Sequence, residues 1–185
     1  MFDLMSEQEA SFLNSSLVLF RNVQDLGRAR PRANASMIRA YRATDLFSSL
    51  THADDILHLI AHANGTELQV GAKTRVSASE LKALAAKGLR MPEVVVSTAC
   101  KFDSKTWHDC LANLGVKILI AAAASVSPAN LAAFDMAFYS ALLTQVRKGQ
   151  ETLERVRASF QLAERYYGSI HAVGTSYARF KLTDL

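Results

Sequence analysis

Hydrophobic and polar positions along the chain predict an alternation of strands and helices. Apolar runs of strand length cover residues 16–23, 56–62, 94–100, 117–123 and 177–182. Apolar residues at helical spacing predict helices over residues 34–50, 77–88, 104–114, 127–148 and 152–167. Turn residues after the second run predict a short hairpin over residues 66–70 and 74–76. Strands that alternate with helices are typical of an α/β protein with a mostly parallel sheet.

Local signals support the boundaries of several helices. Ser77 precedes Glu80 by three residues, which is the pattern of a capping box. Pro128 occupies the first turn of the longest predicted helix, and Gly115 follows the end of another. The chain contains no repeat, low-complexity tract or linker. The sequence therefore predicts a single domain over residues 1–185, a three-layer α/β sandwich whose mostly parallel central sheet is flanked by helices.

The composition is that of a globular protein from a reducing compartment. Of the 185 residues, 50% are hydrophobic and 21% are charged, which suffices for one well-buried core. Cys100 and Cys110 do not make a disulfide framework, and Cys110 lies on an amphipathic predicted helix that should bury it. Residues 1–9 are polar and acidic, and the longest apolar run, residues 118–124, is far shorter than a membrane span. We therefore expect a soluble, cytoplasmic protein with no membrane partner.

Charge and motif content argue against several classes of binding protein. The net charge is +4, but the basic residues form only short clusters such as residues 28–32, so we expect no nucleic-acid partner. The chain contains no glycine-rich phosphate-binding loop, and we expect no cofactor. His58 and His62 are four residues apart, which on a strand spans about 13 Å, too far for a shared metal ion. We expect no metal site and a structural role for His58.

Candidate chemistry lies where two predicted strands end. His62 ends the second apolar run and Cys100 ends the third. Sites in open α/β sheets form at the carboxyl ends of the strands, and the ends of neighbouring strands lie roughly 5–10 Å apart. A histidine at that distance can take the proton of a thiol and so make the thiolate that nucleophilic catalysis needs. The residue types alone leave a second interpretation open, in which Cys100 is a small buried hydrophobic residue and His62 a surface residue.

The two segments together resemble a family signature. A hydrophobic strand that ends in His, followed by one that ends in Ala-Cys, is similar to the paired signature of caspase-like (clan CD) cysteine peptidases. The likeness is greatest to the CHAT branch, which is related to separases, and covers roughly residues 50–167. The further matching segments are a His-x-x-x-His strand at 58–62, a helix start at 76–81, an apolar segment at 115–122, a Phe-Tyr-x-x-Leu helix at 137–143 and a following helix at 153–164.

This resemblance implies a cysteine endopeptidase with a His-Cys dyad. Cys100 would attack a carbonyl of a protein or peptide substrate while His62 handles protons. By position, the backbone N–H groups of Cys100 and Ala63 would bind the oxyanion. CHAT-type domains usually sit beside repeat or sensor modules, which this sequence lacks. We therefore expect control by an activating protein partner or a homo-oligomer, in a bacterial stress or defence pathway.

The sequence departs from the family pattern at the residue after the His. That residue is usually Gly, whereas here it is Ala63, whose Cβ would strain a turn with positive φ. Members that cut after basic residues often carry an acid two places before the Cys, where this chain has Thr98. The nearest carboxylate is that of Asp103, and we expect it to be a solvated loop acid. The alternative is a catalytically inactive caspase-like protein-interaction domain, and a small nucleotide- or ligand-binding α/β module is a third interpretation.

Overall fold

The chain is an α/β protein with a mixed, mostly parallel four-stranded sheet, a small antiparallel sheet and, within the described residues, six helices. The computed structural model describes residues 17–25, 40, 42–50, 55–70, 74–144, 151–171 and 179–185. These residues fall into two units, one with the described residues up to 25 and from 127 to 171, the other with those from 40 to 126 and from 179 to 185. The predicted alternation of strands and helices is confirmed at this level.

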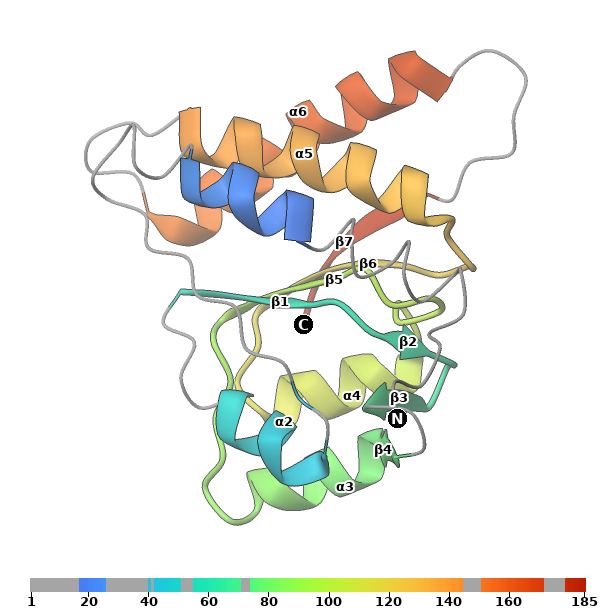
Figure 1. Ribbon diagram of the computed structural model, residues 1–185. Coiled ribbons are helices and arrows are strands. Elements are labelled where there is room, and N and C mark those ends of the chain that lie inside the picture. Colours follow the sequence, from blue (N-terminus) through green and yellow to red (C-terminus); the bar gives the residue numbers. More distant parts are fainter. Residues whose placement is uncertain are drawn as a thin grey trace. The chain divides into compact units, whose positions relative to one another are not determined.

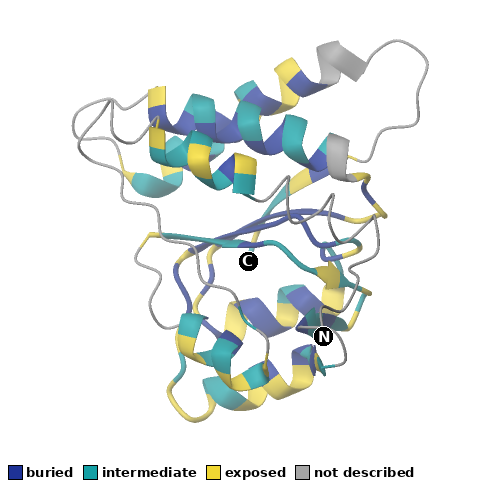
Figure 2. Cartoon of the chain, viewed as in Figure 1, coloured by how far each residue is buried: buried dark blue, intermediate teal, exposed yellow. Residues whose placement is uncertain are grey.

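The four-stranded sheet belongs to the second unit and contains β1 (Ile56–Leu59), β5 (Val94–Ser97), β6 (Ile118–Ala122) and β7 (Phe180–Asp184). The strand order is β1-β5-β6-β7, with β1, β5 and β6 parallel and β7 antiparallel to β6. Both β5 and β6 are buried along their whole length (Figure 2). Their nearly uninterrupted apolar sequences are those of strands covered on both faces. The predicted mostly parallel sheet is confirmed.

The small antiparallel sheet contains β2 (His62–Ala63), β3 (Glu67–Val70) and β4 (Thr74–Ser77). It confirms the predicted hairpin, but the prediction of one continuous strand over residues 56–62 is wrong. The main-sheet strand ends at Leu59, and His62 already pairs with β3 of the other sheet. The side-chain oxygen of Asn64 accepts hydrogen bonds from the backbone N–H groups of Thr66 (2.9 Å) and Glu67 (2.8 Å). This Asn-centred turn folds β3 back onto residues 62–63 and so draws them away from the main sheet.

Three helices of the second unit, α2 (Ala43–Leu50), α3 (Ala78–Ala85) and α4 (Lys105–Asn113), lie on one side of the four-stranded sheet (Figure 1). Ser77 and Glu80 form the predicted capping box at the start of α3, and Ser104 caps α4. Gly115 follows α4 with a φ of 92°, a conformation that glycine adopts without steric cost. The helix predicted over residues 34–50 is confirmed from Ala43 onward; residues 40 and 42 are not helical, and residues 34–39 lie outside the described residues.

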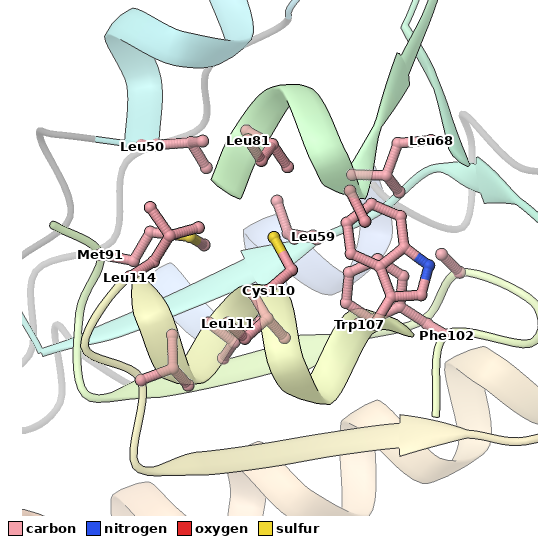
Figure 3. Close-up of a cluster of buried hydrophobic side chains, with 14 of the residues drawn as sticks. Leu50, Leu59, Leu68, Leu81, Met91, Phe102, Trp107, Cys110, Leu111 and Leu114 are labelled. Atoms are coloured by element: carbon pink, nitrogen blue, oxygen red, sulfur yellow. The ribbon is translucent and has the colours of Figure 1, made fainter. Parts of the chain in front are cut away.

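The core of the second unit lies between these helices and one face of the sheet. Leucines from α2, α3 and β1 converge there on Cys110 and Leu111 of α4, as Figure 3 shows. Alternate residues of a strand face opposite sides, and the strand residues on the helix side include Leu59, Val95 and Leu119. Trp107 is fully buried in the same cluster. This core holds α4, and with it the end of β5, in a fixed place.

The first unit is helical in the described residues and contains a helix over residues 17–25, α5 (Pro128–Thr144) and α6 (Thr152–His171). Phe134 of α5 makes edge contacts with Phe160 and Tyr167 of α6, with ring centroids 6.0 Å apart in both pairs. None of the described helices combines the length and the apolar sequence that a bilayer span requires.

The strand predicted over residues 16–23 is wrong, because residues 17–25 are helical. Leu19 is buried and Asn22 donates a hydrogen bond to the sulfur of Met136 on α5 (3.2 Å), whereas Val18 is 56% exposed. Positions 19 and 22 share a face in a helix but would face opposite sides in a strand. A short apolar run does not distinguish a strand from a helix, and here the contacts with α5 favour the helix.

Replacing Ser77 by Ala should lower the free energy of unfolding by about 1 kcal/mol, because the N-cap side chain is lost. The bonds from Ser77 hold the pKa of Glu80 below its usual value, so this pKa should rise in the variant. Urea unfolding and carboxyl titration by NMR measure the two effects. Ser77→Thr keeps the capping hydroxyl and is the control; equal loss in both variants would contradict the capping role.

Candidate active site

Cys100 lies on a tight turn directly after β5. Ala99 before it is fully buried, whereas Cys100 itself is partly exposed. Lys101 has a φ of 56°, in the left-handed region that residues other than glycine rarely adopt. The reversal sends Phe102 back into the core, where its ring is fully buried and stacks on Trp107 with centroids 4.3 Å apart. The turn therefore leaves the Cys100 thiol partly exposed, while the buried ring of Phe102 anchors the turn in the core.

The segment after β6 holds the Cys100 turn through backbone hydrogen bonds. The N–H of Lys101 donates to the carbonyl of Ala124 (3.2 Å), and the N–H of Asp103 donates to that of Ala122 (3.1 Å). The N–H of Val126 lies 3.5 Å from the Cys100 sulfur and donates to it. A peptide donor is thus placed where the negative charge of a thiolate would reside.

The strand register brings the ends of β1 and β5, which precede His62 and Cys100, to the same edge of the four-stranded sheet. β1 and β5 are parallel neighbours, and their last pair is Leu59 with Ser97. The N–H of Thr98 donates to the carbonyl of Leu59 (3.0 Å), so the hydrogen bonding between the two strands continues one residue past Ser97. His62 and Cys100 each follow that last pair by three residues. The two strands are therefore neighbours, as predicted, but His62 does not end β1 and lies on β2 of the small sheet.

The dyad itself is not formed by a hydrogen bond in this structure. The His62 side chain is exposed on β2. Among the described residues, the polar partners of the Cys100 sulfur are the backbone N–H and carbonyl groups of Val126. The thiol is therefore engaged by the segment after β6, and His62 lies on the small sheet.

Ala63 is unstrained and its N–H points away from the hairpin. Among the described residues other than glycine, positive φ occurs only at Lys101, so the strain considered for Ala63 is absent. Hydrogen-bonded and non-hydrogen-bonded pairs alternate along an antiparallel ladder. The N–H of Asn64 donates to Glu67 (3.0 Å), so the next pair, Ala63 with Leu68, is a non-hydrogen-bonded one. The Ala63 N–H is therefore directed to the side of β2 opposite β3.

His58 has the opposite environment to His62. It lies on β1 beside Val96, and its Nε2 atom is buried. Burial lowers the pKa of His58 to about 3, so the ring is neutral at physiological pH. Within the described part of the chain, no group of three or more His, Cys, Asp or Glu side chains is arranged to hold a metal ion.

The sequence interpretation missed a hydrogen bond between Asp103 and His108 beside the turn. Asp103 was expected to be a solvated loop acid, but its side chain is only 6% exposed, so that expectation is wrong. The Nε2 atom of His108 lies 2.6 Å from its carboxylate. The hydroxyl of Thr183 and the ammonium of Lys181, both on β7, approach the same carboxylate at 3.4 and 3.7 Å. The spacing of Asp103, the Ser104 cap and His108 is a local signal for the first contact; the contacts from β7 depend on the tertiary fold.

Cys110 is a core residue, as predicted. It is 1% exposed among the leucines of the core (Figure 3). Desolvation raises the pKa of its thiol to about 11. The two cysteines therefore differ sharply in accessibility.

Comparison with protein-family models and with curated proteins finds no match for this chain.

In the native protein, a small alkylating reagent should modify Cys100 and leave Cys110 unmodified. At pH 8 the thiolate fraction of Cys110 is on the order of one in a thousand, and the reagent has no access to it. Intact-mass spectrometry should show one added group on the native chain and two on the chain in urea. Cys100→Ser should abolish native labelling; labelling that persists in this variant would contradict the assigned burial.

Lowering the pH from 6.5 toward 3 should destabilise the protein through His58. In the unfolded chain this ring takes up a proton near pH 6.5, whereas in the folded chain it does so only near pH 3. Between these values the unfolded state binds more protons, so the free energy of unfolding falls by about 1.4 kcal/mol per pH unit from this group alone. Urea unfolding at several pH values measures the slope, which His58→Leu should reduce. An unchanged slope in that variant would show that His58 is protonated in the folded state.

Proposed function

We propose that this chain is a cysteine endopeptidase of caspase-like fold, with His62 and Cys100 as its catalytic dyad. The observation that carries the proposal is the register of β1 and β5, which brings the strand ends that precede the two residues to one sheet edge. Carboxyl ends of neighbouring parallel strands are where α/β proteins form their sites. The proposal includes a single domain arranged as a three-layer sandwich and a cytoplasmic location.

The reaction would follow the chemistry of thiol acyl transfer. The Cys100 sulfur attacks the carbonyl carbon of the substrate, and His62 takes the thiol proton and delivers it to the leaving amine. Water then hydrolyses the thioester and regenerates the thiol. The N–H groups of Cys100 and Ala63 would bind the oxyanion, and the direction of the Ala63 N–H away from β3 supports this role.

The order of elements in the second unit supports the caspase-like assignment. A strand leads to His62, a small antiparallel sheet and α3 follow, and a second strand leads to Cys100. α4 and β6 come next, as the family resemblance implies for the segments after the Cys.

Activation by a protein partner or by homo-oligomerisation is part of the proposal. The Cys100 sulfur is engaged by Val126, and His62 is exposed on a separate two-residue strand. A change that brings the imidazole onto the sulfur would complete the dyad, and binding energy from a partner can supply it. Control of this kind suits a protease of a bacterial stress or defence pathway.

The same contact favours a second candidate function, a catalytically inactive interaction domain. If the hydrogen bond from Val126 is the permanent state of the thiol, the fold would serve recognition rather than turnover. A stably unreactive Cys100 would separate this function from the first.

Peptide-based electrophilic probes should modify Cys100 of the wild type and fail on Cys100→Ala. His62→Ala should lower the second-order rate of modification by about a hundredfold or more, since a positioned acid–base group contributes 10²–10⁴-fold. Intact-mass spectrometry over a panel of probe sequences gives the rates and a first view of specificity.

Gln69→Ala is the matched control, because Gln69 is the cross-strand partner of His62 and tests local disturbance of β2. It should keep the wild-type rate. Slow modification that ignores the probe sequence and the His62→Ala change would refute the peptidase and leave the interaction domain.

A further inference from the structure

A buried carboxylate joins the Cys100 turn to two other elements of the second unit. Oδ1 of Asp103 lies 2.6 Å from Nε2 of His108 and 3.4 Å from the hydroxyl of Thr183, and its Oδ2 lies 3.7 Å from the ammonium of Lys181. Because a carboxylate only accepts hydrogen bonds, the imidazole and the hydroxyl are the donors. The turn, α4 and β7 therefore meet on one side chain.

Each partner reaches Asp103 for a local reason. The side chain of Ser104 caps α4, and the N–H of His108 donates to the Ser104 carbonyl (2.9 Å), which places His108 one turn into the helix. Lys181 and Thr183 are two residues apart on β7, so they project from the same face of the sheet. The carboxylate lies on that face, next to the start of α4.

The segment that receives Asp103 is also the segment that holds the thiol. The N–H of Asp103 donates to Ala122, the N–H of Lys101 donates to Ala124, and the N–H of Val126 donates to the sulfur of Cys100. These three hydrogen bonds fix the position of the Cys100 turn along residues 122–126. A displacement of Asp103 therefore moves the sulfur relative to its donor.

We propose that Asp103, held by His108, is a positioning residue for Cys100. The role rests on the proposed function, and Asp103 acts through the backbone of the turn rather than on the substrate. Taking a carboxylate out of water is costly unless hydrogen bonds compensate, and the His108 and Thr183 contacts supply that compensation. Without the contact between Asp103 and His108, Phe102 and the backbone hydrogen bonds still hold the turn. The turn can then shift its position along residues 122–126.

The test measures how fast a peptide electrophile inactivates Cys100, separated into binding (KI) and bond formation (kinact). Asp103→Ala and His108→Ala should each lower kinact by about tenfold with KI nearly unchanged, because thiol placement is lost and substrate contacts are kept. The double variant should be no slower than either single variant. Asp103→Asn and His108→Gln keep an acceptor and a donor, and should recover most of kinact.

Asp109→Ala is the control, since it removes an exposed carboxylate from the same helix. Far-UV circular dichroism and urea unfolding establish that each variant is folded. A hundredfold loss in the double variant, a loss confined to KI, or unchanged kinetics in folded single variants would each overturn the proposal.

A second readout separates this inference from the peptidase assignment. Iodoacetamide alkylation of Cys100 needs no peptidase activity and is followed by intact mass in the same variants. If peptide probes do not modify the wild type while alkylation slows equally in both single variants and in the double, the positioning role stands and the peptidase falls. If alkylation rates are the same in all folded variants, the positioning role falls whatever the probes do.

Discussion

Parallel pairing of β1 with β5 is the constraint on which the candidate site depends. The two strands are paired at consecutive positions from Ile56 with Val94 to Leu59 with Ser97, and β5 is fully buried over that length. Both strands run the same way, so the residues that follow them emerge at one edge. His62 and Cys100 are far apart in the sequence, and this register is what brings their segments to a common edge.

The turn after β5 is held by a balance of opposing terms. The left-handed conformation of Lys101 costs roughly 1–2 kcal/mol for a residue with a Cβ. Burying the Phe102 side chain against Trp107 contributes about 1.5–3 kcal/mol, so burial outweighs the strain. The balance explains why a partly exposed thiol can follow a strand that is otherwise entirely buried. A polar residue at 102 would remove the anchor and leave the strain uncompensated.

The sequence pattern predicted the second unit well because its signals are local. Apolar runs at β5 and β6, the Ser77–Glu80 capping box and the glycine after α4 all act within a few residues of the elements they define. Three features depend on distant partners and were not predictable in this way. They are the helix over residues 17–25, the end of the main-sheet strand at Leu59 and the burial of Asp103 under contacts from β7. The parallel arrangement of β1 and β5 followed from the strand pattern, whereas the Val126 contact needed the tertiary fold.

The strand break that the pattern missed is what separates two histidines with different chemistry. Had residues 56–62 formed one strand, His62 would project from the same sheet face as His58, because positions four apart on a strand share a face. On that face the His58 imidazole is buried, and its pKa of about 3 leaves it unable to take up a proton near neutral pH. The Asn64 turn instead commits His62 to the small sheet, where the ring is exposed to solvent. A histidine in the first environment could not take the proton of a thiol, because burial disfavours its charged form. The break after Leu59 is therefore a condition of the proposed chemistry rather than an irregularity in the sheet.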